Sequence, residues 1–383
     1  MDHKDYFPLK LAKGDRFCNR VQERDVLTAN IRQARHTVMI SPRRYGKSSL
    51  VHRVVNDLKL PCANIDLFLA HDDKAVTRRI LDGVGSLLAQ MMPPSQKAMA
   101  FFQKYFSNIT IHIAAAGFAL QSSYEATSIG AVEQIYEALK ALAAIAAKTG
   151  QKVIVFIDEF QDIQSAESAR SIEGAIRNVA QDTDDVVFVF SGSNRHLLLQ
   201  IFDDRSKPLY MLCDKIHLDR MSSKDYYPYI QEAVMTQWGK NWDDATLRKI
   251  MVLTELHPFY VNLLCHALFQ KKSFADEESV IAAWKQCYQV EKRRLFAEVV
   301  PLPLNQKKLL KHLSVNPTME PYSVQHTAGT GMSASSIKAG LDALLQKDLV
   351  FEVVFEDEQI PGFKVGEFRV LDPLLAYALR QYF

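Results

Sequence analysis

The segment ISPRRYGKSSL, residues 40–50, constrains the fold more than any other part of the chain. Its Gly46, Lys47 and Ser48 match the end of the phosphate-binding pattern G-x-x-x-x-G-K-[ST], although Ser41 stands where the pattern begins with glycine. Such a loop lies between a buried strand and a helix whose first N–H groups hold the phosphates. The sequence must therefore supply a strand before the loop and a helix after it.

The residues on either side of the loop meet this requirement. HTVMIS, residues 36–41, is a short apolar run of the kind found in buried parallel strands, and residues 48–58 carry apolar side chains at helical spacing. In this setting Gly46 lets the backbone approach the phosphates, Lys47 reaches the outer phosphates and Ser48 offers its hydroxyl to Mg²⁺. The rest of the predicted nucleotide-binding loop is Pro42, Arg43, Arg44, Tyr45 and Ser49.

A second motif follows later in the chain. Residues 152–163 read KVIVFIDEFQDI, in which an apolar run ends in Asp158 and Glu159. An aspartate in this position can hold Mg²⁺, and the next glutamate can polarise the water that attacks a γ-phosphate. Either motif alone is compatible with an ordinary strand that ends in polar residues. The two motifs in this order predict a site for ATP or ADP with Mg²⁺.

A third strand is predicted at VVFVFSGSN, residues 186–194, because the run is β-branched and aromatic and ends in small polar residues. Ligands of an open parallel sheet gather at the carboxyl ends of its strands. Ser193 or Asn194 would then contact the attacking water or the γ-phosphate. A plain turn at the end of the strand explains the same residues, and the sequence leaves both interpretations open.

The remaining elements predicted for residues 1–222 complete an α/β fold. We expect a parallel sheet of the P-loop NTPase type there. Residues 62–68 form a further predicted strand, and residues 76–92 and 129–147 form helices. The stretch from about 93 to 127 is longer than a normal connection, so we expect an insertion with its own structure.

Several of these motifs together resemble those of a known protein family. PRRYGKSSL, residues 42–50, is similar to the loop of the archaeal-type P-loop ATPases, which are related to the AAA+ and STAND ATPases and tolerate a first residue other than glycine. KVIVFIDEFQDI resembles the Walker B motif of that family, and FSGSN its sensor strand. RFCNRVQERDVL, residues 16–27, resembles its N-terminal box beside the adenine, and this resemblance implies Asn19 and Arg20 as nucleotide contacts.

Two later segments also resemble the family, although each differs from the family's usual sequence. Residues 204–218 resemble a segment that usually continues with Gly-Arg, where this chain has Met211 and Leu212. Arg205 is then the candidate for an arginine that acts across a subunit interface. ELHPFYVNLL, residues 255–264, resembles the start of a helix in the family's lid domain. There His257 is a candidate phosphate contact, or alternatively a cap for the helix that begins at Pro258.

The last two regions predict a helical lid over residues 223–300 and a winged helix over residues 301–383. The order helix, helix, two strands and a closing helix supports the winged helix. Residues 301–383 contain eight Lys or Arg and nine Asp or Glu, so we expect this module alone to bind DNA weakly at most. Residues 285–311 contain seven Lys or Arg and two Glu. This excess of basic residues favours either a positively charged stripe that contacts phosphates or a helix face exposed to solvent.

The composition adds broad limits. Hydrophobic residues make up 48% and charged residues 23%, with a net charge of +2, as in an ordinary globular protein. The five cysteines are far apart and form no CxxC pair, which favours a reducing compartment. We find no apolar stretch long enough for a bilayer and no signal core near the N-terminus, so we expect a cytoplasmic protein without a membrane partner.

The sequence thus predicts an enzyme that hydrolyses ATP to switch conformation or assembly, through self-association or a protein partner. Lys47, Glu159, Ser193 and Arg205 are its candidate catalytic residues, and Ser48 and Asp158 its candidate Mg²⁺ ligands. Two alternatives stay open: a DNA-binding regulator or initiator that uses its winged helix, and an interaction scaffold of a defence or toxin–antitoxin system that does not hydrolyse ATP.

Overall fold

The computed structural model describes residues 6–10, 18–115, 117–122, 130–271, 273–354, 356–358, 360 and 363–382. The chain divides into two compact units. We call residues 21–43 with 47–218 the sheet unit, and residues 1–20, 44–46 and 219–383 the helical unit. The proposed boundary between separate domains at residue 300 is not tested by this division and stays a prediction.

The sheet unit is built on five parallel strands in the order β2-β5-β6-β1-β7. Most of their residues are buried, as expected for a parallel sheet covered on both faces. The order places β1, which leads into the predicted loop, beside β6, and β6 beside β5. The strands are β1 (Thr37–Ile40), β2 (Cys62–Asp66), β5 (Val153–Asp158), β6 (Val186–Gly192) and β7 (Asp214–His217).

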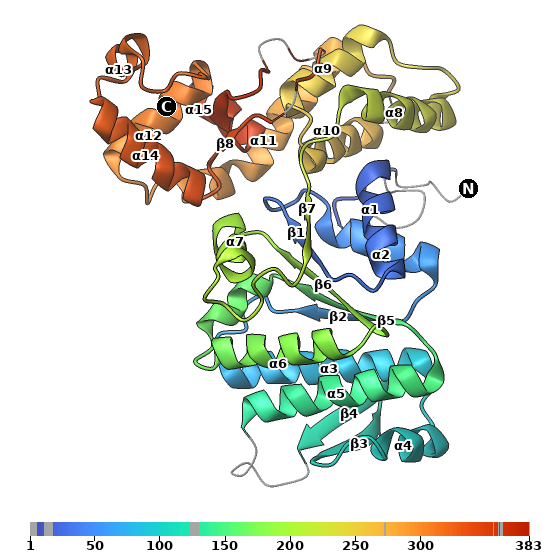
Figure 1. Cartoon of the computed structure of the whole chain (residues 1–383). Coiled ribbons are helices and arrows are strands. Elements are labelled where there is room, and N and C mark those ends of the chain that lie inside the picture. The colour runs from blue at the N-terminus through green and yellow to red at the C-terminus, as the bar shows by residue number, and fades with distance from the viewer. Residues whose placement is uncertain are drawn as a thin grey trace. The chain divides into compact units, whose positions relative to one another are not determined.

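Helices cover both faces of this sheet. Figure 1 shows α3 (Asp73–Met91), α5 (Ala131–Thr149) and α6 (Ala169–Asp182) together on one face, and α1 (Val21–Arg32) with α2 (Lys47–Leu58) on the other. The 3₁₀ helix η2 and helix α7 follow β5 and β6, respectively, and pack on each other through Phe160 and Phe202. Their bounds are Phe160–Ser165 and Arg195–Asp203.

The predicted insertion has structure of its own. It contains α4 (Gln96–Gln103) and an antiparallel hairpin of β3 (Ile109–Ala114) and β4 (Gly117–Ser122). The hairpin packs closely on α3, because a Cβ atom on Gly85 would lie 2.0 Å from the carbonyl oxygen of Phe118. Residues 123–127 of the predicted insertion lie outside the described residues.

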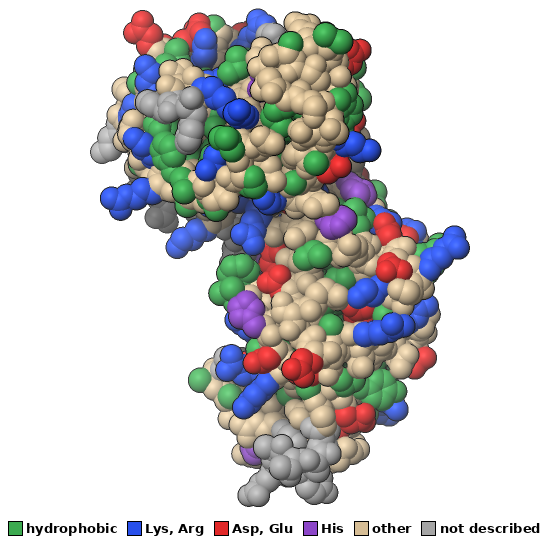
Figure 2. All heavy atoms as spheres, turned by 90° about the vertical axis from the view of Figure 1, so that its left-hand side faces the viewer, with side chains coloured by type: hydrophobic (Ala, Val, Ile, Leu, Met, Phe, Trp, Pro, Cys, Tyr) green, Lys and Arg blue, Asp and Glu red, His purple; other side chains and the backbone are tan. Residues whose placement is uncertain are grey.

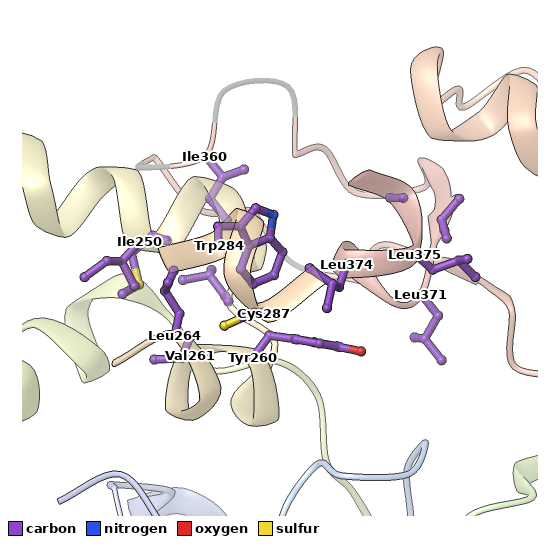
Figure 3. Packing of buried hydrophobic residues seen from close by; sticks show 14 of the residues in the cluster. Ile250, Tyr260, Val261, Leu264, Trp284, Cys287, Ile360, Leu371, Leu374 and Leu375 are labelled. Atoms are coloured by element: carbon purple, nitrogen blue, oxygen red, sulfur yellow. The ribbon is translucent and has the colours of Figure 1, made fainter. Parts of the chain in front are cut away.

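The helical unit contains a helix bundle and a C-terminal module with one continuous core. In Figure 3, Tyr260 and Trp284 of the bundle lie with Leu374 and Leu375 of the C-terminal helix. The bundle is α8 (Ser223–Trp238), α9 (Asp244–Thr254), α10 (Pro258–Gln270) and α11 (Glu277–Val299). The module is α12 (Leu304–Val315), α13 (Val324–Thr330), α14 (Ala334–Gln346), β8 (Val350–Glu352), β9 (Phe368–Val370) and α15 (Pro373–Tyr382), which is the order of a winged helix.

Helix α11 extends through the basic residues that follow Glu291. It continues to Val299 because Leu295 and Val299 keep an apolar face buried. The basic residues 292–294 are therefore part of a helix. Within the described ranges, the structure contains no helix with both the length and the apolar character needed to cross a membrane.

Candidate nucleotide-binding site

The predicted loop joins β1 to α2, as the motif requires. Gly46 has a φ of +91°, and a Cβ atom there would meet nothing within 4 Å. Its conformation, rather than lack of space, therefore favours glycine. Arg44 also has a positive φ, of 66°, which is unusual for a residue with a side chain. The loop thus leaves β1 and reaches the first residue of α2 through two left-handed residues.

Lys47 contacts Ser41, the residue at the first position of the loop pattern. The Lys47 ammonium is buried and donates to the carbonyl oxygens of Ser41 and Pro42 at 3.0 and 3.1 Å. It also lies 3.3 Å from the hydroxyl of Ser41. Oxygen acceptors of the loop itself therefore occupy the positions around the ammonium, and a phosphate oxygen is the kind of acceptor that can replace them.

Ser48 and Asp158 form the polar contact between the two motifs. The Ser48 hydroxyl donates to Asp158 Oδ2 at 2.6 Å. The other oxygen, Oδ1, accepts from the Ser191 hydroxyl and, at 3.0 Å, from the Glu159 N–H. Asp158 is thereby fixed at the end of β5, where its carboxylate faces the start of α2.

This pair fits a magnesium ion by its chemistry and spacing. Mg²⁺ prefers oxygen ligands at 2.0–2.1 Å, which places neighbouring ligands about 3 Å apart, so Ser48 and Asp158 would need to separate only slightly. The described residues contain no group of three or more His, Cys, Asp or Glu that could hold a metal ion. A Mg²⁺ ion in a nucleotide site takes most of its ligands from phosphates and water.

Glu159 is held beside these residues in an unusual conformation. Its backbone is left-handed, with φ 50° and ψ 42°, and such strain in a residue with a side chain is typical of functional sites. Its Oε2 accepts from the N–H and the hydroxyl of Ser193 at 3.1 and 2.7 Å, and from Gln161 Nε2 at 2.6 Å. The side chain of Glu159 is half-buried.

Ser193 therefore joins the predicted site, whereas Asn194 caps a helix. The Asn194 side chain accepts from the Leu197 N–H at 3.1 Å at the start of α7. Arg43 of the loop donates from Nε to the Ser193 hydroxyl at 3.1 Å. Arg43, Ser193 and Glu159 thus form one hydrogen-bonded chain from the loop to the presumed water-polarising carboxylate.

The tip of the loop, Arg44–Gly46, packs within the helical unit. The ring of Tyr45 is buried and lies edge-on to His257, with 4.8 Å between ring centroids. The Tyr45 hydroxyl accepts from Arg220 Nε at 3.3 Å. The guanidinium of Arg44 lies over the Phe259 ring, 4.2 Å from its centroid.

Asn19 and Arg20, which the family resemblance implies as adenine contacts, make contacts with the protein itself. The Asn19 amide donates to the carboxylate of Asp225. Arg20 donates to the carbonyl oxygens of Tyr45 and Asp219 at 3.0 and 2.7 Å. Arg20 therefore braces the loop tip, and a nucleotide contact for either residue stays a prediction. Residues 16 and 17 of the same box lie outside the described residues.

His257 caps helix α10. Its Nδ1 accepts from the Phe259 N–H at 3.2 Å, and the ring is buried. Burial and the nearby charge of Arg220 hold the pKa of His257 well below its usual value, so the ring is neutral. The geometry is that of the capping alternative, and a phosphate contact by His257 stays a prediction.

Ser49 and Arg205 are the last two residues that the sequence predicts for the site. Ser49 is in the first turn of α2, one residue after Ser48. Arg205 is exposed in the turn that follows α7. Sequence reasoning missed Gln161 and Ser191. Ser191 could have been found, because it precedes Ser193 by two residues on a strand and so points to the same face.

The sheet order and the loop between β1 and α2 define the fold of a P-loop NTPase, and the predicted fold class is confirmed. Comparisons with family models and with curated proteins found no match. Among solved structures, a Walker-type ATPase of Pyrococcus abyssi aligns with a TM-score of 0.69 at 16% identity, covering 98% of this chain and 99% of that chain. The ORC2 protein of Aeropyrum pernix, solved as ADPNP-ADP complexes, aligns with a TM-score of 0.57 at 14% identity, covering 99% and 96%.

Proposed function

We propose that this protein binds Mg-ATP at the loop of residues 41–48 and hydrolyses it. The observation that carries the proposal is the hydrogen bond from Ser48 to Asp158, which is 2.6 Å long. Lys47 directly precedes Ser48 in one motif, and Glu159 directly follows Asp158 in the other. Transfer of a phosphoryl group to water needs positioning and neutralisation of charge more than covalent chemistry. Likeness in fold to a Walker-type ATPase and to a protein solved with ADPNP and ADP supports it.

Each residue of the site has a distinct role in the proposed hydrolysis. Lys47 exchanges the carbonyl oxygens of Ser41 and Pro42 for phosphate oxygens. Ser48 and Asp158 would hold a magnesium ion, which would supply positive charge against the charge that develops on the phosphates. Glu159 orients the attacking water and accepts its proton, while Ser193 fixes the Glu159 carboxylate.

The output of hydrolysis is proposed to be a change of conformation or of assembly with a partner. Arg44, Tyr45 and Gly46 pack within the helical unit, so a change of the loop backbone on phosphate binding would reach that unit. The helical unit includes the C-terminal module, whose elements follow the order of a winged helix. Modules of this kind bind partners in other proteins. Self-association and binding of another protein both suit this proposal.

The test is titration of the purified chain with Mg-ATP. The variant Lys47→Ala should lose nucleotide binding, because the ammonium is the cation closest to the outer phosphates in such loops. Lys148→Ala is a matched control, since Lys148 is exposed near the end of α5. Unchanged binding by Lys47→Ala would contradict the phosphate assignment. Tight binding without measurable turnover in the wild type would favour the non-hydrolysing scaffold.

A further inference from the structure

The side chain of Gln161, in η2, is buried next to the proposed water-polarising residue. Its Nε2 donates to Glu159 Oε2 at 2.6 Å and lies 3.2 Å from Asp162 Oδ1. Its Oε1 is buried and has no hydrogen-bond partner. A buried amide with an unsatisfied oxygen is unfavourable for packing alone, so its position calls for another reason.

The orientation of this amide follows from its neighbours. A reversed amide would place its carbonyl oxygen against the carboxylates of both Glu159 and Asp162, which can only accept hydrogen bonds when ionised. The donating side of Gln161 is therefore the side that faces Glu159. The unsatisfied Oε1 is the cost of directing the donor toward that carboxylate.

Gly192, the last residue of β6, provides the space for the amide. A Cβ atom on Gly192 would lie 2.0 Å from Gln161 Oε1 and 3.3 Å from Leu198 Cδ1. The first distance is far too short for any real contact, so a side chain at position 192 would displace the Gln161 amide. The glycine beside Ser193 thus permits the contact between Gln161 and Glu159.

Together these contacts hold Glu159 by one oxygen. Oε2 accepts three hydrogen bonds, from Gln161 Nε2 and from the N–H and hydroxyl of Ser193. Within the described residues, Oε1 accepts none. A carboxylate that is fixed through one oxygen presents the other in a defined direction, which is what a water-orienting group requires.

We propose that Gln161 is a positioning residue, which fixes the carboxylate of Glu159 so that Oε1 faces the attacking water. This inference rests on the proposed ATP hydrolysis. Gln161 itself does not touch the nucleotide in this proposal, and it acts only through Glu159. Its loss should therefore lower the turnover number and leave the affinity for ATP unchanged.

The experiment compares turnover and ATP affinity in full-length variants. Gln161→Met keeps the volume of the side chain without the donor, and it should lower kcat about 10- to 100-fold, the loss expected when a reacting group is misplaced. The dissociation constant for Mg-ATP should change less than about twofold, because Gln161 does not touch the nucleotide in this proposal. Gln181→Met, on the exposed face of α6, is the matched control and should behave like the wild type.

A double-mutant cycle separates positioning from a general effect on the fold. Gly192→Ala alone should lower kcat as Gln161→Ala does, because the new methyl group displaces the amide. When Gln161 is already alanine, Gly192→Ala should cause no further loss, so the two effects are not additive. Additive losses would overturn the proposal, as would normal kcat in Gln161→Met. A wild type that binds ATP without turnover would instead remove the proposed hydrolysis and this inference with it.

Discussion

The hydroxyl of Ser193 donates to the carboxylate of Glu159 at 2.7 Å, and the N–H of the same serine donates to the same oxygen at 3.1 Å. These residues come from the ends of β6 and β5, two neighbouring strands of the parallel sheet. Arg43 adds a hydrogen bond to the Ser193 hydroxyl from the loop. The carboxylate is thus held in part by the backbone and hydroxyl of a residue that directly follows a strand of the sheet.

Glu159→Gln should keep ATP affinity and lower turnover by at least about 10²-fold, the usual loss when a positioned base is removed. The amide oxygen of glutamine can still accept from Ser193, so the fold around the site should persist. Affinity is measured by titration and turnover by phosphate release. Glu167→Gln, at an exposed glutamate before α6, is the control. Equal turnover in the wild type and Glu159→Gln would exclude Glu159 as the base.

Arg205 should act in trans if the protein works as an assembly, because its side chain is exposed in a turn of the sheet unit. Arg205→Ala and Lys47→Ala should each be inactive alone. Mixed subunits should regain part of the activity, since some interfaces would then join an intact loop to an intact Arg205. Phosphate release by the mixture and light scattering in ATP measure this. If the mixture regains no activity and the protein stays a monomer in ATP, Arg205 does not act across a subunit interface.

The basic stretch on α11 should give only weak, salt-dependent binding of DNA. Arg294 is engaged within the protein, because it donates to Glu291 and Glu298, each at 2.6 Å, and lies 3.2 Å from Asp372. Figure 2 shows Lys and Arg side chains spread among uncharged and acidic ones on the face in view. Of the three consecutive basic residues 292–294, only Lys292 and Arg293 are therefore exposed.

The full-length variant Lys292→Ala/Arg293→Ala tests this expectation. Titration of duplex DNA at several salt concentrations should show affinity that falls steeply with salt in the wild type. Each lost phosphate contact reduces the slope of log affinity against log salt by about 0.9. Lys338→Ala, on the exposed face of α14, serves as the comparison within the C-terminal module. Tight, sequence-selective binding that both variants retain would instead support the DNA-binding regulator.

Glu173 should make the sheet unit less stable as the pH rises. The side chain is fully buried on α6, where Oε1 accepts from Gln164 at 2.6 Å and Oε2 has no partner. Burial raises the pKa of Glu173, so the folded protein binds its proton more tightly than the unfolded chain does. Stability is therefore lost as the pH rises from the usual glutamate range through the raised pKa.

Glu173→Gln removes this pH dependence and should melt higher than the wild type at pH 8. A gain of about 2–4 °C is expected, the shift that 1 kcal/mol produces in a domain of this size. The difference should shrink as the pH falls through the usual glutamate range, because below it the carboxyl group is protonated in the unfolded chain as well. Thermal melts followed by circular dichroism measure it, with Glu167→Gln as the exposed control. A difference that does not depend on pH would contradict the role of the charge.

The sequence was most informative where the chemistry needs neighbouring residues. Lys47 with Ser48, and Asp158 with Glu159, are adjacent pairs at the ends of strongly apolar strands, so motif and strand support each other. Strand β7 was missed because its four residues, DKIH, bury only Ile216 and carry no clear pattern. Helix α13 was missed because its seven residues bury only His326.

Contacts between distant residues were beyond the reach of a single sequence. Nothing near Gln161 indicates that Gly192, at the end of another strand, leaves room for its amide. Likewise, no local pattern shows that Arg20 donates to the carbonyl oxygen of Tyr45. The order of the strands decides the pairing of Gln161 with Gly192, and apolar runs reveal strands without revealing their order.

The helical unit is discontinuous in sequence, which has a consequence for synthesis on the ribosome. Phe7 packs on Tyr229 and Phe269, and the carbonyl oxygen of Tyr6 accepts from Tyr229. These partners emerge more than 200 residues after the N-terminus, and chains are made at about 5–20 residues per second. The N-terminal residues must therefore wait at least about 10 seconds for their partners. The sheet unit is complete at residue 218, before Tyr229 and Phe269 are made, so it can begin to fold first.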